Sequence, residues 1–217
     1  MSDGNNFNYF MHENGLDRIN HHYINQSRTA SPFDYYNHTR LYIPDDMPFP
    51  DNNSSEYIHS IANQILQLIE ATNGHTAILF TSYKVLYKVH EIVADQLGKY
   101  TVICMTKSNR TAISDFKKCE NGILFASGSM WEGVDCIGDC LSSIIIVRLP
   151  FPIRSMVLEA KKQACTDVQR FIDLYVVPEM LIKLRQGIGR LIRCETDTGL
   201  IAILDSRAYS GVYADRI

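Results

Sequence analysis

The sequence predicts an α/β protein with a doubly wound, mostly parallel sheet and helices on both faces. The first observation is a series of short apolar runs without the apolar–polar alternation of half-exposed strands, which is typical of strands buried on both faces. The second is that helical patterns separate most of these runs, as the crossover connections of a parallel sheet require. The third is composition, because 217 residues with 46% hydrophobic and 21% charged content can bury a core.

The N-terminal part differs from the rest of the chain. Residues 1–55 are rich in Asn, Asp, His and Tyr and are interrupted by prolines, so we expect little regular structure there beyond a strand at 41–43. We interpret this part as an arm or linker from a preceding domain. The α/β domain then occupies residues 56–217.

Helices and strands follow one another from Ser54 onward. Apolar residues recur at helical spacing up to Gly74, which predicts a helix with Ser54 or Ser55 as its N-cap. Ligands of parallel sheets bind beyond the carboxyl ends of the strands, where Ser82, residues 127–129 and Asp205 fall. The other expected elements are strands at 77–82, 101–104, 123–127, 142–149 and 199–205, and helices at 84–97, 111–119, 155–176 and 178–193.

Residues 186–193, QGIGRLIR, give the strongest chemical signal. If the segment is helical, steps of about 100° place Gln186, Gly189, Arg190 and Arg193 within roughly one 100° arc. Arginine forks suit phosphate oxygens, and a glycine inside a helix costs about 1 kcal/mol relative to alanine, so Gly189 suggests the close approach of a ligand. The alternative is an amphipathic helix with a solvated basic face.

Charge is distributed unevenly along the chain. Residues 148–193 hold 9 Lys/Arg against 4 Asp/Glu, a net charge of +5, whereas residues 1–75 hold 3 against 9, a net charge of −6. A basic patch around the QGIGRLIR segment is what a polyanion site needs, although a solvated surface of one sign would have the same composition.

The loop GSMWEGVDCIGD, residues 128–139, follows a buried strand. Its glycines, Gly133 among them, allow tight turns that bring backbone N–H groups near a ligand, and carboxylates such as Asp135 could hold a cationic side chain or a water. The alternative is a long connection made of turn residues. Trp131 has two open roles, to stack on a nucleic-acid base or to fold back onto the core.

Several classes of protein are disfavoured by what the sequence lacks. It contains no G-x-x-x-x-G-K-[S/T] phosphate loop and no acidic pair ending an apolar strand, so we expect no nucleotide hydrolysis by this chain alone. The arginines of residues 186–193 would make sense as fingers acting on a nucleotide held elsewhere. The six cysteines suggest reduced thiols, and the pair Cys136 and Cys140 lacks further zinc ligands. No apolar run approaches 18 residues and no signal peptide opens the chain, so a cytoplasmic protein without a membrane partner is expected.

Several motifs in order resemble one family. FTSY (80–83), FASGSMWEGVDCIGD (125–139), IIIVRLPFP (144–152), QGIGRLIR and GLIAILDSR (199–207) are similar to the motifs of the second RecA-like domain in the DinG/XPD group of superfamily-two helicases. SPFDYYNHTRLYIPDDMPFP (31–50) resembles the stretch that leads into that domain in DinG-type proteins. The resemblance covers residues 28–207 and adds a RecA-like identity to the predicted fold.

The resemblance implies a role for each matching residue. Gln186, Arg190 and Arg193 would face the phosphates of ATP, with the two arginines as fingers beside Gly189. Gly133 and Asp135 would lie at the nucleotide cleft and couple it to nucleic acid. The residues on the side of the single strand would be Thr81, Ser82, Tyr83, Ser129 and Trp131.

The resemblance also implies partners and cofactors. The chain would be the C-terminal part of a longer, monomeric ATP-dependent DNA helicase that moves 5′ to 3′ on single-stranded DNA. ATP and Mg²⁺ would be bound mainly by the first RecA-like domain of the same polypeptide. The iron–sulfur cluster of the family belongs to that first domain, so none of the cysteines here is assigned to it.

Two alternatives come from other classes. CMTKSNRT, residues 104–111, is a Cys-x5-Arg-Thr string like the phosphate loop of cysteine phosphatases, in which Cys104 would be the nucleophile. The loop holds no glycine and no histidine precedes the cysteine, which argues against this interpretation. The second alternative is a module that binds single-stranded nucleic acid without being part of a motor.

Overall fold

The computed structural model describes residues 7–29, 34–105, 111–128, 131, 141–192, 194–210 and 213–217. Contacts group the chain into two compact units, each made of two stretches of sequence. The first unit comprises Met1–Ser31 and Pro150–Arg185, and the second comprises Pro32–Leu149 and Gln186–Ile217. The boundary expected near residue 55 concerns the domains of a longer protein and stays a prediction.

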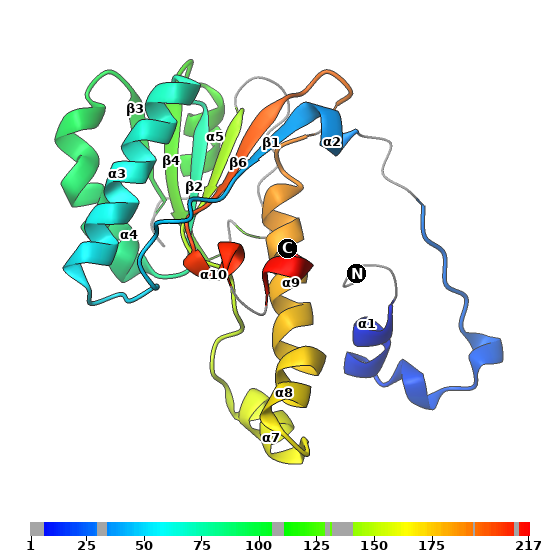
Figure 1. Cartoon of the computed structure of the whole chain (residues 1–217). Helices are drawn as coiled ribbons and strands as arrows, with labels where there is room; N and C mark the ends of the chain where they lie inside the picture. The colour runs from blue at the N-terminus through cyan, green and yellow to red at the C-terminus, as the bar shows by residue number, and fades with distance from the viewer. Residues whose placement is uncertain are drawn as a thin grey trace. The chain divides into compact units, whose positions relative to one another are not determined.

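The second unit is built on a parallel sheet (Figure 1). Within the described residues, six strands pair in the order β1-β6-β5-β2-β4-β3, and every pair is parallel. This arrangement confirms the predicted fold class. The strands are β1 Thr39–Tyr42, β2 Thr76–Phe80, β3 Thr101–Cys104, β4 Gly122–Ser127, β5 Ser143–Ile146 and β6 Gly199–Ile203.

The central strands β2, β4 and β5 are buried on both faces, which explains why their sequences do not alternate. Helices α3, Ser55–Thr72, and α4, Tyr83–Val93, lie side by side over one face (Figure 1). Alternate residues of four strands, and the residues that directly follow β5 and β6, join the core on that side. These residues are Ile78, Phe80, Ile123, Phe125, Ile145, Val147, Ala202 and Leu204.

Helix α3 begins and ends close to the predicted residues. The Ser54 hydroxyl accepts the backbone N–H of Tyr57 over 3.2 Å, as an N-cap does. At the other end Asn73 takes the left-handed C-cap conformation, with φ 54°. Gly74 follows with φ 87°, and a Cβ there would lie 2.8 Å from the carbonyl oxygen of Asn121. The stop signal at Gly74 is therefore a close approach between two backbones.

Shorter elements complete the second unit. The predicted helix at 84–97 is α4 followed by a 3-10 turn, Ala94–Leu97, and the predicted helix at 111–119 is α5, Ala112–Lys117. The others are α2 Tyr35–His38, α10 Ser206–Tyr209 and a 3-10 turn Ala214–Arg216.

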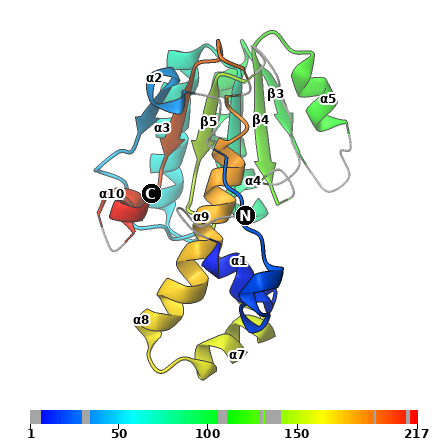
Figure 2. The same ribbon diagram turned by 90° about the vertical axis from the view of Figure 1, so that its right-hand side faces the viewer.

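The first unit is helical. Its elements are α1 Asn8–Glu13, 3-10 turns Leu16–Arg18 and His21–Tyr23, α7 Met156–Ala164, α8 Val168–Phe171, a π-helical turn Ile172–Val176, and α9 Val177–Ile188, whose last residues belong to the second unit (Figure 2). Lys161 joins α7 to α1 through an ion pair with Glu13 and lies 4.9 Å from the ring centre of Tyr175. None of the helices described is both long and apolar enough to span a membrane.

The break between the last two predicted helices lies elsewhere than expected. The expected helices at 155–176 and 178–193 place it near residue 177. In the structure the break falls between α7 and α8, where the Asp167 carboxylate caps α8 by accepting the Arg170 N–H over 2.7 Å. The π-helical turn stands directly before α9, so Pro178 lies in the first turn of α9, where proline is tolerated.

The end of α9 is a second correction. The helix was expected to continue to residue 193, but it ends at Ile188. Two tight turns follow, with N–H to carbonyl bonds from Arg190 to Gly187 and from Leu191 to Ile188. The turns bury Leu191, which is 2% exposed, against Gly199 of β6. The contact is close, since a Cβ added at Gly199 would lie 2.7 Å from the Leu191 side chain.

Candidate functional site

The carboxyl ends of β2 and β4 bring together two segments that the sequence singled out. The strands are neighbours, and Phe80 pairs with Ser127 at the last register position. Tyr83, in the first turn of α4, donates its hydroxyl to the backbone carbonyl of Ser127 over 3.5 Å. Gly128 follows with φ 72°, a backbone conformation that residues other than glycine rarely adopt. It therefore turns the chain at the end of β4. The two segments therefore share one edge of the sheet.

The start of α4 presents hydrogen-bond donors at this edge. Ser82 occupies the N-cap position with an extended backbone, φ −146° and ψ 126°, and its side chain makes no capping hydrogen bond. Thr81, directly before it, is exposed. The first N–H groups of a helix lack intrahelical partners and carry the positive end of the helix dipole. Two hydroxyls beside such groups suit a phosphate oxygen.

Trp131 lies at the same edge but is buried, with 5% of its surface exposed. Its indole N–H donates to the Phe80 carbonyl over 3.2 Å. Its ring packs against Gly187, where a Cβ would lie 3.0 Å from the nearest ring carbon. Of the two roles left open by the sequence, the geometry matches packing onto the core. The base contact expected of Trp131 stays a prediction, although its ring is covered in this structure.

The arginine-rich segment is positioned differently from the predicted helix face. Gln186 lies in the last turn of α9, whereas Gly189 and Arg190 follow the helix. The Arg190 Nε donates to the backbone carbonyl of Gln186 over 3.2 Å, which keeps these two residues together. Close approach occurs at Gly187, against Trp131, so the argument that placed a glycine inside the helix beside a ligand does not apply to Gly189.

Four predicted site residues, Ser129, Gly133, Asp135 and Arg193, lie outside the described residues. The same holds for Cys136 and Cys140. In the part of the chain that the structure describes, no three His, Cys, Asp or Glu side chains are grouped as a metal site would require.

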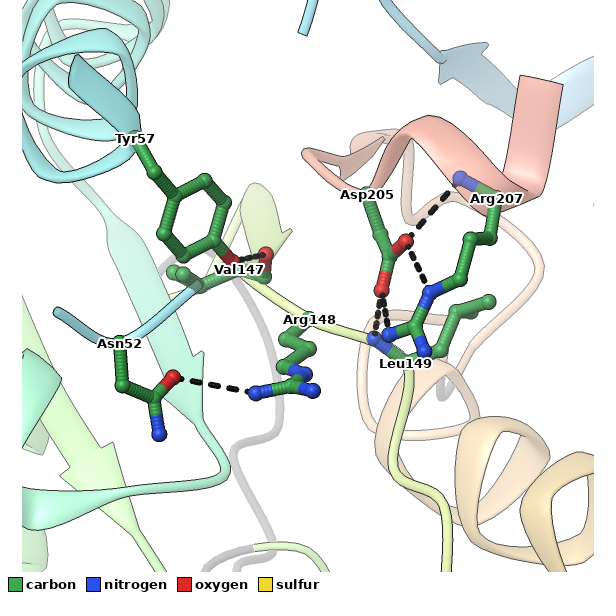
Figure 3. A network of polar contacts seen from close by, with 7 residues as sticks. All are labelled: Asn52, Tyr57, Val147, Arg148, Leu149, Asp205 and Arg207. Atoms are coloured by element: carbon green, nitrogen blue, oxygen red, sulfur yellow. Dashed lines mark hydrogen bonds and ion pairs between the residues drawn. The ribbon is translucent and has the colours of Figure 1, made fainter. Parts of the chain in front are cut away.

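A buried carboxylate joins the carboxyl ends of β5 and β6 (Figure 3). Asp205 is completely buried and accepts the backbone N–H of Leu149 over 2.9 Å. Arg207 donates to the same carboxylate from its backbone N–H at 3.0 Å, its Nε at 2.9 Å and its Nη2 at 2.7 Å. The hydrogen bond from Leu149 to Asp205 thus fixes the chain that follows β5 to the chain that follows β6, and the ion pair with Arg207 holds the carboxylate in place.

A second group of contacts in Figure 3 links the end of β5 to α3 and to the loop before it. Arg148 donates to the Asn52 side-chain oxygen over 3.0 Å, and the Tyr57 hydroxyl donates to the Val147 carbonyl over 3.3 Å. Burial, and secondarily the Asp205 carboxylate, raise the pKa of Tyr57 far above its ordinary value, so the hydroxyl stays a donor.

Sequence reasoning placed Asp205 at this edge but gave it no partner. It assigned no role to Arg148 or Arg207. The two-residue spacing between Asp205 and Arg207 directly after a strand was a signal that could have suggested the pair.

The cysteine-phosphatase alternative needs a thiol with a lowered pKa at Cys104. Burial instead raises the pKa of this thiol, and the arginine of the string, Arg110, lies outside the described residues. Since the protonated thiol is a poor nucleophile, we expect slow alkylation of Cys104 by iodoacetamide at neutral pH in the native chain, measured by peptide mass spectrometry. We also expect no turnover of p-nitrophenyl phosphate. Turnover that disappears in Cys104→Ser would restore the alternative.

A comparison with protein families adds to this geometry. The model of the helicase C-terminal domain matches residues 65–217, most of the chain. The chain belongs to this family. The match includes β2, β4, β5, β6 and the end of α9, but not Asn52 and Tyr57.

The curated relatives of this helicase C-terminal domain include YoaA and DinG proteins. It is 32% identical over 215 residues to the ATP-dependent DNA helicase YoaA of Haemophilus influenzae, covering 98% of this chain and 32% of the relative. It is 31% identical over 197 residues to the 3′-5′ exonuclease DinG of Bacillus subtilis, covering 86% of this chain and 21% of the relative. The domain thus spans a third or less of the length of these relatives.

Solved structures agree with the fold. A structure titled XPD_Helicase matches with a TM-score of 0.69 and 18% identity, covering 82% of this chain and 33% of that one. A second, titled XPD_APO, matches with a TM-score of 0.64 and 19% identity, covering 82% and 38%. Both support the RecA-like architecture of the parallel sheet.

Proposed function

We propose that this chain is the second motor domain of an ATP-dependent 5′ to 3′ DNA helicase. It would work as part of a longer, monomeric polypeptide whose first RecA-like domain binds ATP and Mg²⁺. Residues 1–55 would be the arm or linker from that first domain, and residues 56–217 the motor domain itself. The observation that supports this best is the combination of a helicase-family RecA-like sheet with arginines after α9 and no phosphate-loop sequence.

On the nucleotide side, Gln186, Arg190 and Arg193 would act on the phosphates of ATP held by the partner domain. The hydrogen bond from Arg190 to the Gln186 carbonyl supports a common position for the first two. Arginine is suited to this task because its planar fork stays charged and can bind two phosphate oxygens at once. Gly133 and Asp135 would lie at the nucleotide cleft and couple its closure to the bound single-stranded DNA.

On the strand side, Thr81, Ser82, Tyr83 and Ser129 would contact the backbone of single-stranded DNA. The uncapped start of α4 supports this assignment, since it offers hydroxyl and N–H donors with the helix dipole. Trp131 would hold the end of α9 against β2 through Gly187 and the Phe80 carbonyl. The DNA contacts at the start of α4 and the arginines after α9 would then be coupled through the packed ring of Trp131.

The isolated chain tests this proposal. We expect salt-sensitive binding of oligo-dT in fluorescence anisotropy, because each neutralised phosphate adds about 0.7 to the slope of log affinity against log salt. We expect no ATP hydrolysis above background in a phosphate-release assay, with or without the oligonucleotide. ATPase activity that copurifies with the chain, or the absence of strand binding at low salt, would contradict the proposal.

A further inference from the structure

The exposed side of α4 carries a short repeat. Its first residues read YKVLYKV, so a Tyr-Lys pair recurs after four positions. Residues four apart lie on the same side of a helix, about 5–6 Å between Cβ atoms. The valines and leucine of the repeat are buried toward the sheet, which leaves one row of tyrosines, Tyr83 and Tyr87, beside one row of lysines, Lys84 and Lys88.

The tyrosine row is ordered and partly open. The Tyr83 hydroxyl is fixed on the Ser127 carbonyl, and the Tyr87 ring stacks on Tyr83 with 6.3 Å between ring centroids and 27° between planes. Tyr87 nevertheless keeps 48% of its surface exposed. A tyrosine that is held by a neighbour and still exposed can stack on a flat partner with little loss of conformational entropy.

The lysine row is held by neutral oxygens. The Lys84 Nζ donates to the side-chain oxygen of Asn53 over 2.7 Å, and the Lys88 Nζ donates to the backbone carbonyl of Asn52 over 3.3 Å. Arg148 donates to the side-chain oxygen of the same Asn52. One loop therefore gathers three cations at one place.

Their positive charge is not cancelled by ion pairs. Within the part of the chain that the structure describes, Lys84, Lys88 and Arg148 are not within ion-pair distance of a carboxylate. The carboxylate of the same loop, Asp51, accepts the backbone N–H of Asn53 instead. Ammonium and guanidinium groups have three and five donors, so each cation retains donors for an anion.

We propose that Tyr87, Lys84, Lys88 and Arg148, which we call the α4 strip, form a further contact with single-stranded nucleic acid. The cations would bind phosphates while the Tyr87 ring stacks on a base. The inference rests on the proposed function, because α4 begins directly after Ser82, where that function places the single-stranded DNA. It extends the contact by one helical turn.

The pairing of the two rows favours a single strand over other polyanions. A strand has phosphates on one side and unpaired bases on the other, which matches a cationic row beside an aromatic row. The bases of a duplex are stacked inside it and cannot reach a ring on a helix surface. A phosphorylated or acidic peptide would use the cations but would give Tyr87 no base to stack on.

Anisotropy titration of fluorescein-labelled oligo-dT with the full chain tests the strip. Tyr87→Leu should weaken binding about tenfold, since stacking contributes about 1–3 kcal/mol per base, and should leave the salt slope unchanged. The double variant Lys84→Gln/Lys88→Gln should lower the salt slope by about 1.4, because each single-strand phosphate contact contributes about 0.7. Photo-crosslinking with a 5-iododeoxyuridine oligonucleotide should label Tyr87 in peptide mass spectra.

Matched controls lie elsewhere on the second unit. Tyr209→Leu removes another exposed tyrosine and Lys117→Gln another exposed lysine, and both should bind like the unmodified chain. Thr81→Ala/Ser82→Ala separates the two proposals. If this variant loses affinity while the strip variants behave like the controls, the strip is overturned and the proposed function stands. If the unmodified chain itself does not bind oligo-dT, both are overturned.

Discussion

Replacing Arg193 or Arg190 with alanine in the polypeptide that joins this chain to its proposed ATP-binding domain should lower the DNA-stimulated ATPase rate about 10³-fold or more. Fingers that stabilise the charge of the transferred phosphoryl group contribute about 10³–10⁵ in kcat, and a 10³-fold loss corresponds to about 4 kcal/mol of transition-state stabilisation. Lysine at either position should not restore the rate, because a point charge lacks the fork of the guanidinium. Steady-state phosphate release measures the effect.

Binding measurements make this prediction specific for a motor. Affinity for oligo-dT should change by no more than about twofold in the same variants, because the fingers act on ATP and not on the strand. Arg185→Ala is the matched control, since Arg185 is an exposed arginine one residue before Gln186. An ATPase rate that survives both arginine substitutions would favour the alternative of a binding module outside any motor.

Arg190 requires one further control. Arg190 follows α9, and its Nε donates to the carbonyl of Gln186 in the last turn of the helix. Loss of the Arg190 side chain could therefore also disturb the helix end. Thermal unfolding of Arg190→Ala separates the two effects. An unchanged midpoint with a collapsed ATPase rate assigns Arg190 to the nucleotide, whereas a lowered midpoint assigns part of its effect to local structure.

The sheet was predictable because its signals are local. Strands buried on both faces read as short apolar runs, as in residues 77–80 and 144–147, and the crossover helices between them carry their own periodicity. Helix α3 was equally clear, because Ser54 and Gly74 mark its two ends by side-chain and backbone chemistry that acts over a few residues.

The end of α9 was not predictable because its cause is distant in sequence. Residues 186–193 have helical periodicity, but the chain turns after Ile188 to bury Leu191 against Gly199 of β6. The strand-end hydroxyls could be placed, since carboxyl ends of parallel strands meet at one edge. The role of Trp131 could not, because it depends on Gly187 lying beside β2, which only the folded chain reveals.

The contact between Asp205 and Leu149 was hidden for a similar reason. β5 and β6 are neighbours in the sheet, yet the helices α7, α8 and α9 and a π-helical turn separate them in the chain. Nothing in the local sequence pairs a carboxylate after one strand with a backbone N–H after the other. Such a link between strand ends follows only from strand order.

Arg207→Ala should destabilise the second unit by about 3–5 kcal/mol, because it leaves the carboxylate of Asp205 buried without its charged partner. The pair qualifies for this estimate because Asp205 is 0% exposed and the Arg207 side chain only 19%. Urea unfolding followed by the fluorescence of Trp131 measures the loss. Trp131 is the only tryptophan and belongs to the same unit as Asp205, so its signal reports on the right transition.

The double variant Asp205→Asn/Arg207→Ala tests the cause of this loss. If an uncompensated buried charge is responsible, neutralising Asp205 should recover part of the stability that Arg207→Ala removes, although it weakens the acceptor of the Leu149 N–H. Lys117→Ala, an exposed change on α5, should stay within about 0.5 kcal/mol of the unmodified chain. A double variant less stable than Arg207→Ala alone would contradict this cause and would show that Asp205 contributes mainly as the acceptor of the Leu149 and Arg207 backbone N–H groups.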